Sequence, residues 1–202
     1  MPAPKRGRLI PVFVLSLISS AVSSCAVLQA PVSPPSFTRD QIRHRSTGGI
    51  EIDALPIQKL EDYWELFDDY LPEIGLVAIW VELRNKSSAD FDLSRINWEL
   101  RRGTLRLPEA SIADIFKQYY KRRHVRFYSI DSDQVSRDAM SRVLLNTGRL
   151  GRSESRKGLL IFKSMSPQPP DWSRDGVLVA RGFQPEAEGH QTLELPLFHA
   201  NP

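Results

Sequence analysis

The stretch "GLVAIWVELRN", residues 75–85, decides the fold class. Its side chains alternate between two kinds with a period of two, which is the pattern of a β-strand that buries one face. One face is wholly aliphatic and is made by Val77, Ile79, Val81 and Leu83. The other face carries Ala78, Trp80, Glu82 and Arg84. The sequence therefore predicts a strand whose aliphatic face lies against the core.

A second strand is expected directly after this one. Residues 85–90, "NKSSAD", have the composition of a turn, and residues 91–101 are again rich in apolar side chains. The apolar positions of this second stretch change parity between Leu93 and Ile96, which predicts a bulge or a corner. We expect the two strands to form an antiparallel hairpin.

Further strands and three helices complete the predicted fold. Alternating or continuous apolar runs predict strands at 49–54, 157–163, 177–182 and 190–198. Helical spacing predicts helices near 59–70, 109–122 and 132–146. Strands that run through the chain with helices inserted between them favour a mainly β fold, an antiparallel β-sandwich with helical insertions.

The apolar stripes of the helices are read from their spacing. The first helix has Leu60, Tyr63, Trp64 and Phe67; the second has Ile112, Ile115, Phe116, Tyr119 and Tyr120; the third has Val135, Ala139, Val143 and Leu144. For the third helix, Asp131 or Ser132 is the expected N-cap and Gly148 the expected glycine after the C-terminus.

The two stretches "GLVAIWVELRNKSSADFDL" and "ESRKGLLIFK" resemble the Ig-like sandwich modules of bacterial surface lipoproteins. In those modules a strand ends in an Asn-rich turn, and a late strand carries a core of glycine and apolar residues. The resemblance implies an Ig-like antiparallel sandwich. The chain departs from immunoglobulins proper because it lacks the cysteine pair between the sheets, and a likeness of fold implies no function.

The N-terminus has the layout of an export signal. Lys5, Arg6 and Arg8 precede an apolar run over 9–22, which is too short for a membrane-spanning helix of about 20 residues. The run ends in Val22-Ser23-Ser24-Cys25, which resembles the lipobox of bacterial lipoproteins. That resemblance implies cleavage between Ser24 and Cys25 by signal peptidase II, and lipid on the Cys25 thiol.

The predicted organisation follows from this reading. Residues 1–24 are the signal peptide, 25–47 the lipidated cysteine and a Pro- and Ser-rich tether, and 48–202 a single sandwich domain. The alternative is ordinary secretion, because Ser24-Cys25-Ala26 also fits signal peptidase I and would release a soluble chain that starts at Val27.

A lipid on Cys25 implies an extracytoplasmic protein attached to the cell membrane. Two or three acyl chains hold a protein on a bilayer stably. In enterobacteria-like sorting, an acidic residue after the cysteine retains a lipoprotein in the inner membrane, and here that position is Ala26. If the organism has two membranes, we therefore expect the outer membrane, with the domain facing the periplasm.

The charge balance removes the main argument for a nucleic-acid partner. Of the 27 Lys and Arg residues, three lie in the predicted signal, so the mature chain has as many basic residues as its 24 acidic ones. The basic pI of about 9.1 belongs to the precursor. We expect no nucleic-acid partner.

Candidate catalytic and metal-binding groups are sparse. The histidines, His44, His124, His190 and His199, have no HExxH or HxH partner, so we expect no metal site. The carboxylate pairs in "DDY" (68–70) and "DSD" (131–133) lack the spacing of a calcium loop, and we expect an exposed helix end and helix capping respectively. No phosphate loop, dinucleotide fingerprint or nucleophile elbow occurs, and no cofactor is expected.

The most polarised stretch is "FKQYYKRRHVRFY", residues 116–128, in which basic and aromatic side chains alternate. Its candidate residues for an anionic partner are Lys117, Lys121, Arg122, Arg123, Arg126, Tyr119 and Tyr120. Such a partner is another envelope protein or an anionic glycan or lipid. The favoured interpretation is plainer: a helix with a tyrosine stripe in the core and a solvated cationic face compensated by nearby acids.

Two functions of different classes follow. The favoured one is a lipid-anchored envelope protein that acts as a non-catalytic binding or structural module. The alternative is an envelope hydrolase whose site is formed by sandwich loops and the insertion at 109–148. Converging carboxylates, or a His beside a Ser, would favour the enzyme.

Overall fold

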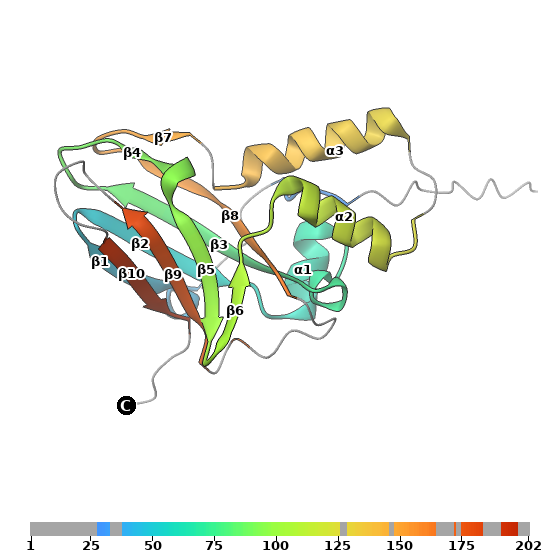
Figure 1. The fold of residues 1–202 in the computed structure, drawn as a ribbon, viewed down its shortest axis with the longest axis horizontal. Coiled ribbons are helices and arrows are strands. Elements are labelled where there is room, and N and C mark those ends of the chain that lie inside the picture. Colours follow the sequence, from blue (N-terminus) through green and yellow to red (C-terminus); the bar gives the residue numbers. More distant parts are fainter. Residues whose placement is uncertain are drawn as a thin grey trace, which may run out of the picture.

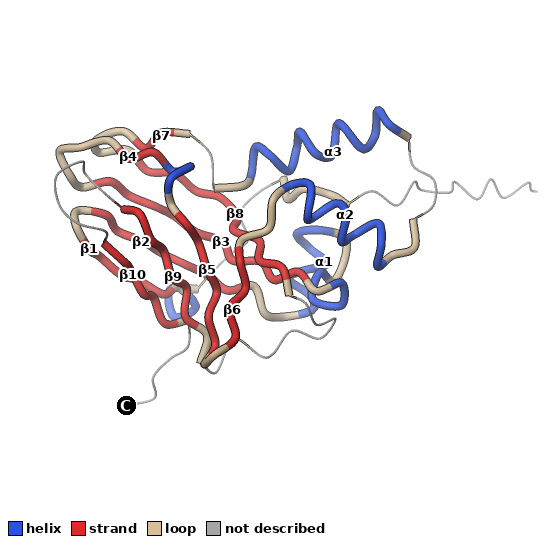
Figure 2. Tube along the Cα trace, in the orientation of Figure 1, coloured by secondary structure: helices blue, strands red, loops and turns tan. Residues whose placement is uncertain are grey.

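The fold is a β-sandwich covered on one face by helices (Figure 1). The computed structural model describes residues 28–32, 38–125, 129–145, 148–164, 172, 175–183 and 191–197. The strands form antiparallel sheets, and three helices are inserted between them, as Figure 2 shows by colour. The predicted mainly β fold with helical insertions is confirmed.

The first sheet has four strands in the order β1-β2-β3-β8. These are β1 (Arg43–Thr47), β2 (Ile50–Pro56), β3 (Leu76–Asn85) and β8 (Ser155–Lys163). The strand that the opening stretch predicts is β3, which lies between β2 and β8. It pairs with β8 over all but its last residue, from Leu76 opposite Lys163 to Arg84 opposite Ser155.

The second sheet has the order β10-β9-β5-β6. Its strands are β5 (Asn97–Arg102), β6 (Leu105–Pro108), β9 (Val177–Phe183) and β10 (Gln191–Pro196). One edge of this sheet approaches the first, because an isolated bridge joins Glu109, just after β6, to Phe162 of β8.

The predicted hairpin between 75–85 and 91–101 is wrong, since β3 and β5 lie in different sheets. Between them, β4 (Phe91–Asp92) pairs with β7 (Arg149–Leu150), and a 3₁₀ turn follows at Leu93–Arg95. Asp92 caps this turn by accepting a hydrogen bond from the Ser94 backbone N–H. The turn is the corner that the parity change predicts, and it redirects the chain to the second sheet.

The sandwich core lies between the two sheets. The aliphatic side chains of β3 are buried there with Trp98 and Leu100 of β5. The opposite face of β3 is also buried over Ala78 and Trp80, because the helices pack on it. β3 therefore has a core on each side, and the structure has three layers: helices, first sheet and second sheet.

The helical layer consists of α1 (Leu60–Phe67), α2 (Ile112–Arg122) and α3 (Ile130–Val143). In α2 the predicted stripe is confirmed, with Ile115, Phe116 and Tyr119 buried. In α1 the stripe is only half right: Tyr63 and Phe67 are buried, but Leu60 and Trp64 are 48% and 50% exposed. The helix packs with Leu66 in their place.

The predictions for α3 fail at its ends. Its N-cap is Ser129, whose hydroxyl accepts a hydrogen bond from the Ser132 N–H, so Asp131 and Asp133 lie in the first turn. The helix ends at Val143, so that Gly148 lies too far beyond it to be the glycine that terminates the helix. Val135 is 67% exposed, and Met140 is the residue that the helix buries.

The N-terminal part of the described chain is packed against the helices. Leu28 is 1% exposed and belongs to the apolar core between the helices and the first sheet, and Ala30 packs against this core. β1 (Arg43–Thr47) pairs with β2 throughout, with Thr47 opposite Ile50. The predicted tether at 25–47 is therefore too long, because the residues at both of its ends that the structure describes make contacts with the domain.

Candidate functional site

A pocket of about 290 Å³ lies at one end of the sandwich. Val77 and Ile79 of β3 and Leu100 of β5 form part of its wall, and all three belong to the core between the sheets. The rest of the wall comes from the segment after β2, from Tyr63 of α1, and from Tyr70, Trp172 and Leu197. The pocket thus extends into the space between the two sheets.

The wall combines apolar and aromatic side chains with polar groups, and Gln58 is one of its lining residues. None of the described residues that line it carries a charge. Tyr63 and Tyr70 meet edge to face, with ring centroids 5.5 Å apart at an interplanar angle of 85°. A mixture of apolar surface and polar groups is found in small-molecule sites, which are on the whole more apolar than this wall.

Two hydrogen-bond donors in the wall are buried. The Tyr63 oxygen accepts a hydrogen bond from the Ala78 N–H at 3.1 Å, but its own proton has no acceptor among the described residues. Burial raises the pKa of the Tyr63 hydroxyl above its ordinary value, so the hydroxyl keeps its proton. Trp172 is 6% exposed, and its Nε1–H has no partner in the part of the chain that the structure describes.

The cationic stretch of α2 does not form one aromatic and basic surface. Lys117, Lys121 and Arg122 are exposed, whereas Tyr119 is buried at 6% exposure. Tyr120 is half-buried, and its hydroxyl donates a hydrogen bond to Asp133 of α3. Arg126 lies outside the described residues.

Arg123, the next candidate in this stretch, has a structural partner. Its Nε donates to Oδ2 of Asp69 at 3.1 Å, another of its nitrogens contacts Oδ1, and Nη1 lies 3.1 Å from Glu73. The hydrogen bonds to Asp69 raise the pKa of the guanidinium. Asp69 is buried, so the expectation of an exposed helix end is wrong for it.

The other candidate acids take part in caps and ion pairs. Asp133 binds Arg137 at 2.8 Å as well as Tyr120. Asp114 lies 2.7 Å from the Lys163 ammonium and accepts a hydrogen bond from Ser111, and these bonds lower its pKa. Asp114 of α2 and Asp133 of α3 thus each lie in an ion pair.

The described histidines do not converge. His44 lies 2.6 Å from Asp53 on the exposed side of the first sheet, and His124 is exposed after α2. His190 and His199 lie outside the described residues. Over the described ranges, no group of three or more metal-ligating side chains is found.

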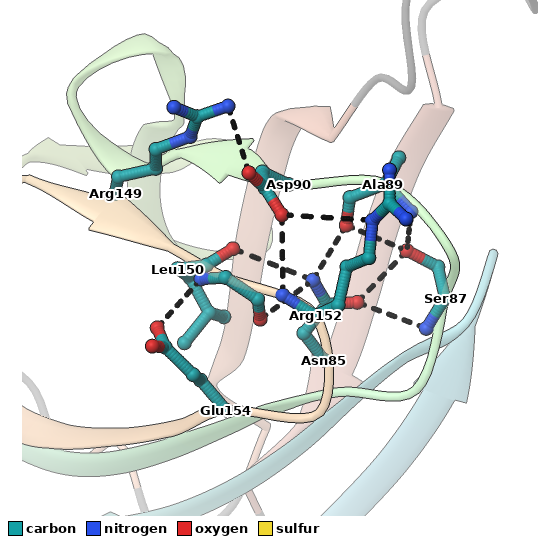
Figure 3. Close-up of polar contacts among 9 residues, drawn as sticks. Asn85, Ser87, Ala89, Asp90, Arg149, Leu150, Arg152 and Glu154 are labelled. Carbon is teal, nitrogen blue, oxygen red and sulfur yellow. Dashed lines mark hydrogen bonds and ion pairs between the residues drawn. The ribbon is translucent and has the colours of Figure 1, made fainter.

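The turn after β3, which begins at Asn85, is held by a network of hydrogen bonds (Figure 3). The buried amide of Asn85 donates to the carbonyl oxygens of Ala89 at 2.7 Å, Gly151 at 3.0 Å and Leu150 at 3.3 Å. Its Oδ1 accepts from the backbone and hydroxyl of Ser87. Figure 3 shows the Asn85 amide between the loop after β3 and the loop before β8, which it joins.

The candidate lipidation residues Val22, Ser23, Ser24 and Cys25 lie outside the described residues. Within the described ranges, no helix is both long and apolar enough to cross a membrane.

The pocket was not predicted from the sequence. Its wall comes from segments between residues 56 and 197, and neither Trp172 nor Tyr70 stands in a recognisable motif. The one signal present was the aliphatic face of β3, which marks the core into which the pocket extends.

Comparison with known proteins gives a few distant structural neighbours. No protein-family model matches the chain, and no curated protein matches it. A functionally unknown protein from Listeria monocytogenes is similar over 76% of this chain and 79% of its own, with 11% identity and a TM-score of 0.37. A "putative lipoprotein (ycdA)" from Bacillus subtilis is similar over 75% of this chain, with 10% identity and a TM-score of 0.37, and this chain spans 38% of its length. A conserved hypothetical protein from Bacillus anthracis is similar over 74% of this chain and 91% of its own, with 13% identity and a TM-score of 0.34.

Proposed function

We propose that the chain is a lipid-anchored envelope protein that acts as a non-catalytic binding module at the membrane surface. The observation that carries the anchor is the order of the N-terminal residues: a basic patch, a short apolar run, and then Val22-Ser23-Ser24-Cys25. Cys25 is the only cysteine of the chain, so it has no disulfide partner, and lipidation gives it a role. With Ala26 after it, the proposal places the domain at the outer membrane in an organism with two membranes.

The packing of Leu28 sets the distance between the domain and the bilayer. Only two residues, Ala26 and Val27, separate Cys25 from Leu28, and the three Cα–Cα steps between them span at most about 11 Å. Because Leu28 is buried in the helical layer, a lipid on Cys25 would hold this layer close to the membrane. The domain would then act on what lies at the bilayer surface.

The binding function is supported by the pocket and by how the polar groups of the 109–148 insertion are used. Ser111 caps α2 and bonds to Asp114, and Asp133 is paired with Arg137. A His beside a Ser would favour a hydrolase. No such pair is found in the described part of this insertion. We therefore propose a module that binds and does not catalyse.

The test is intact-mass analysis of the membrane-fraction protein, for the wild type, Cys25→Ala and Ser23→Ala. We expect a wild-type chain that begins at Cys25 and carries acyl mass. Cys25→Ala should lose both processing and membrane retention. Ser23→Ala is the matched control, because it keeps a small residue at its position and should be processed normally.

An unacylated wild-type product that begins at Val27 would overturn the anchor. It would show cleavage by signal peptidase I and leave a secreted sandwich domain.

A further inference from the structure

The exposed surface of α2 carries cations that no acid of the described chain neutralises. We propose that this surface lies on the lipid bilayer, where Lys117, Lys121 and Arg122 contact the headgroups of anionic lipids. This inference rests on the proposed lipid anchor and adds to it a second, electrostatic contact with the same membrane.

The three cations of α2 differ from their neighbour in having no ion-pair partner. Lys117, Lys121 and Arg122 are exposed, and none of them forms an ion pair within the ranges that the structure describes. Arg123, by contrast, is held by Asp69. The compensation by nearby acids that the sequence suggests for this face is thus found at Arg123 and not at the other three positions.

The exposed surface of α2 also differs in charge from those of the other two helices. The one acidic residue of α2, Asp114, is neutralised by its ion pair with Lys163. α1 exposes Glu61, and α3 exposes Asp131. Exposed carboxylates repel an anionic surface, so α2 is the helix whose charge suits one.

The proposed anchor would lie next to α2. Leu28 belongs to the same apolar core as Ile115 and Phe116, which α2 buries. Because Cys25 is at most about 11 Å from Leu28, a lipid on Cys25 would enter the bilayer close to this helix.

The spacing of the lysines and the anchor together favour contact with the headgroups. Lys117 and Lys121 are four residues apart and therefore lie on the same side of the helix. Each Lys or Arg near an anionic bilayer adds a favourable interaction, which falls off within a Debye length of about 10 Å. A few such charges bind a free protein weakly, but a lipid anchor raises the effective concentration of the helix at the surface.

Lysine labelling in vesicles tests this contact. The lipidated protein is purified from membranes, its acyl mass is verified, and it is reconstituted in vesicles of phosphatidylcholine with or without about 30% phosphatidylglycerol, an anionic lipid. Sulfo-NHS acetate then acetylates exposed lysines, and peptide mass spectrometry gives the rate at each one. We expect Lys117 and Lys121 to react about fivefold more slowly in the anionic vesicles. In about 1 M NaCl, which screens charges within roughly 3 Å, the difference should disappear.

Lys86 is the internal reference for this measurement. It is exposed in the turn after β3, which lies at the end of the sandwich away from α2 (Figure 1). Its rate of acetylation should be the same in both kinds of vesicle.

Two double variants assign the contact to α2. Lys121→Gln/Arg122→Gln should reduce the protection of Lys117 in anionic vesicles. Arg45→Gln/Arg152→Gln is the matched control, because it removes the same charge from exposed residues of β1 and of the loop before β8. It should leave the protection of Lys117 unchanged.

Equal rates in the two kinds of vesicle, protection that survives high salt, or an equal effect of the two double variants would each overturn the inference. Protection in native membranes but not in anionic vesicles would assign this face to a protein partner instead. A lipidated protein without protection would keep the anchor and lose the bilayer contact. A chain without acyl mass would overturn the anchor, and the inference with it.

Discussion

Arg123 joins the end of α2 to Asp69, 54 residues earlier in the chain. The guanidinium contacts both carboxylate oxygens and also reaches Glu73. The Asp69 side chain is 9% exposed, so the pair holds a nearly buried charge in place. The most basic stretch of the sequence thus contributes a structural link between α2 and the end of α1.

Replacing Arg123 should destabilise the domain. Arg123→Ala leaves the Asp69 carboxylate buried without its partner, and we expect the free energy of unfolding to fall by about 2 kcal/mol. The free energy of unfolding of Arg123→Lys should lie between those of Arg123→Ala and the wild type. Lysine keeps the charge but cannot contact both carboxylate oxygens at once, as the guanidinium does. Urea unfolding measures both values. Arg122→Ala, at the exposed neighbouring residue, is the control and should change the free energy of unfolding by less than about 0.5 kcal/mol. Equal losses of stability in Arg123→Ala and Arg122→Ala would contradict the structural role of the Arg123–Asp69 pair.

The Asn85 network should be sensitive to an almost isosteric change. Asn85→Asp replaces the amide that donates to three carbonyl oxygens by an oxygen that repels them. We expect a loss on the order of 3 kcal/mol in the free energy of unfolding. Ser88→Ala in the same turn is exposed and should be nearly neutral. A stable Asn85→Asp variant would show that the two loops hold together without the amide.

Stability should fall in acid partly through Asp114. Its pKa is lowered, first by the hydrogen bond from Lys163 and then by that from Ser111. A carboxyl whose pKa is lower in the folded state stabilises the protein fully above the unfolded pKa of about 3.9, and this contribution is lost as the pH falls through the folded value. Asp114→Asn should therefore be less stable than the wild type at pH 7, by less than about 1 kcal/mol because the side chain is partly exposed, and equal to it near pH 2.

Urea unfolding at both pH values checks this dependence. Glu65→Gln, at an exposed position of α1, is the control and should change the free energy of unfolding little at pH 7. A stability gap for Asp114→Asn that persists in acid would assign the loss to the α2 cap and not to the carboxylate charge.

The packing of Leu28 can be tested without the membrane. Leu28→Ala should lower the free energy of unfolding by about 2 to 4 kcal/mol, as for other large-to-small changes in a core. Val32→Ala, at a fully exposed position nearby, should have no effect. If both variants are neutral, residues 28–32 contribute nothing to the fold, and the long tether predicted from the sequence is restored.

The strands could be predicted because alternation of side chains is local. The buried aliphatic face of β3 follows directly from Val77, Ile79, Val81 and Leu83. Burial of Trp80 on the other face could not be predicted, because it depends on helices that come from elsewhere in the sequence. The turn after β3 was also recognised, but its partner is the loop before β8, some 65 residues later, and not the next strand.

Long-range partners also explain what was missed at the candidate sites. Asp69 has the sequence context of an exposed helix end, and its burial depends on Arg123. The sequence does not single out Ser129 as the cap, because Asp131 and Ser132 are equally good capping residues by type. The pocket requires both sheets and Trp172 to be in place, so no single stretch of sequence predicts it.

The pairing of β3 with β8 has a consequence for how the chain acquires its structure during synthesis. A chain that emerges with its N-terminus first can pair β3 with β2 early, but the other edge of β3, from Leu76 to Arg84, has no partner until residues 155–163 appear. An unpaired edge on an apolar strand is prone to associate with other chains. Any nascent chain that ends before Ser155 therefore exposes an unpaired apolar strand edge, and we expect it to depend on chaperones until residues 155–163 have emerged.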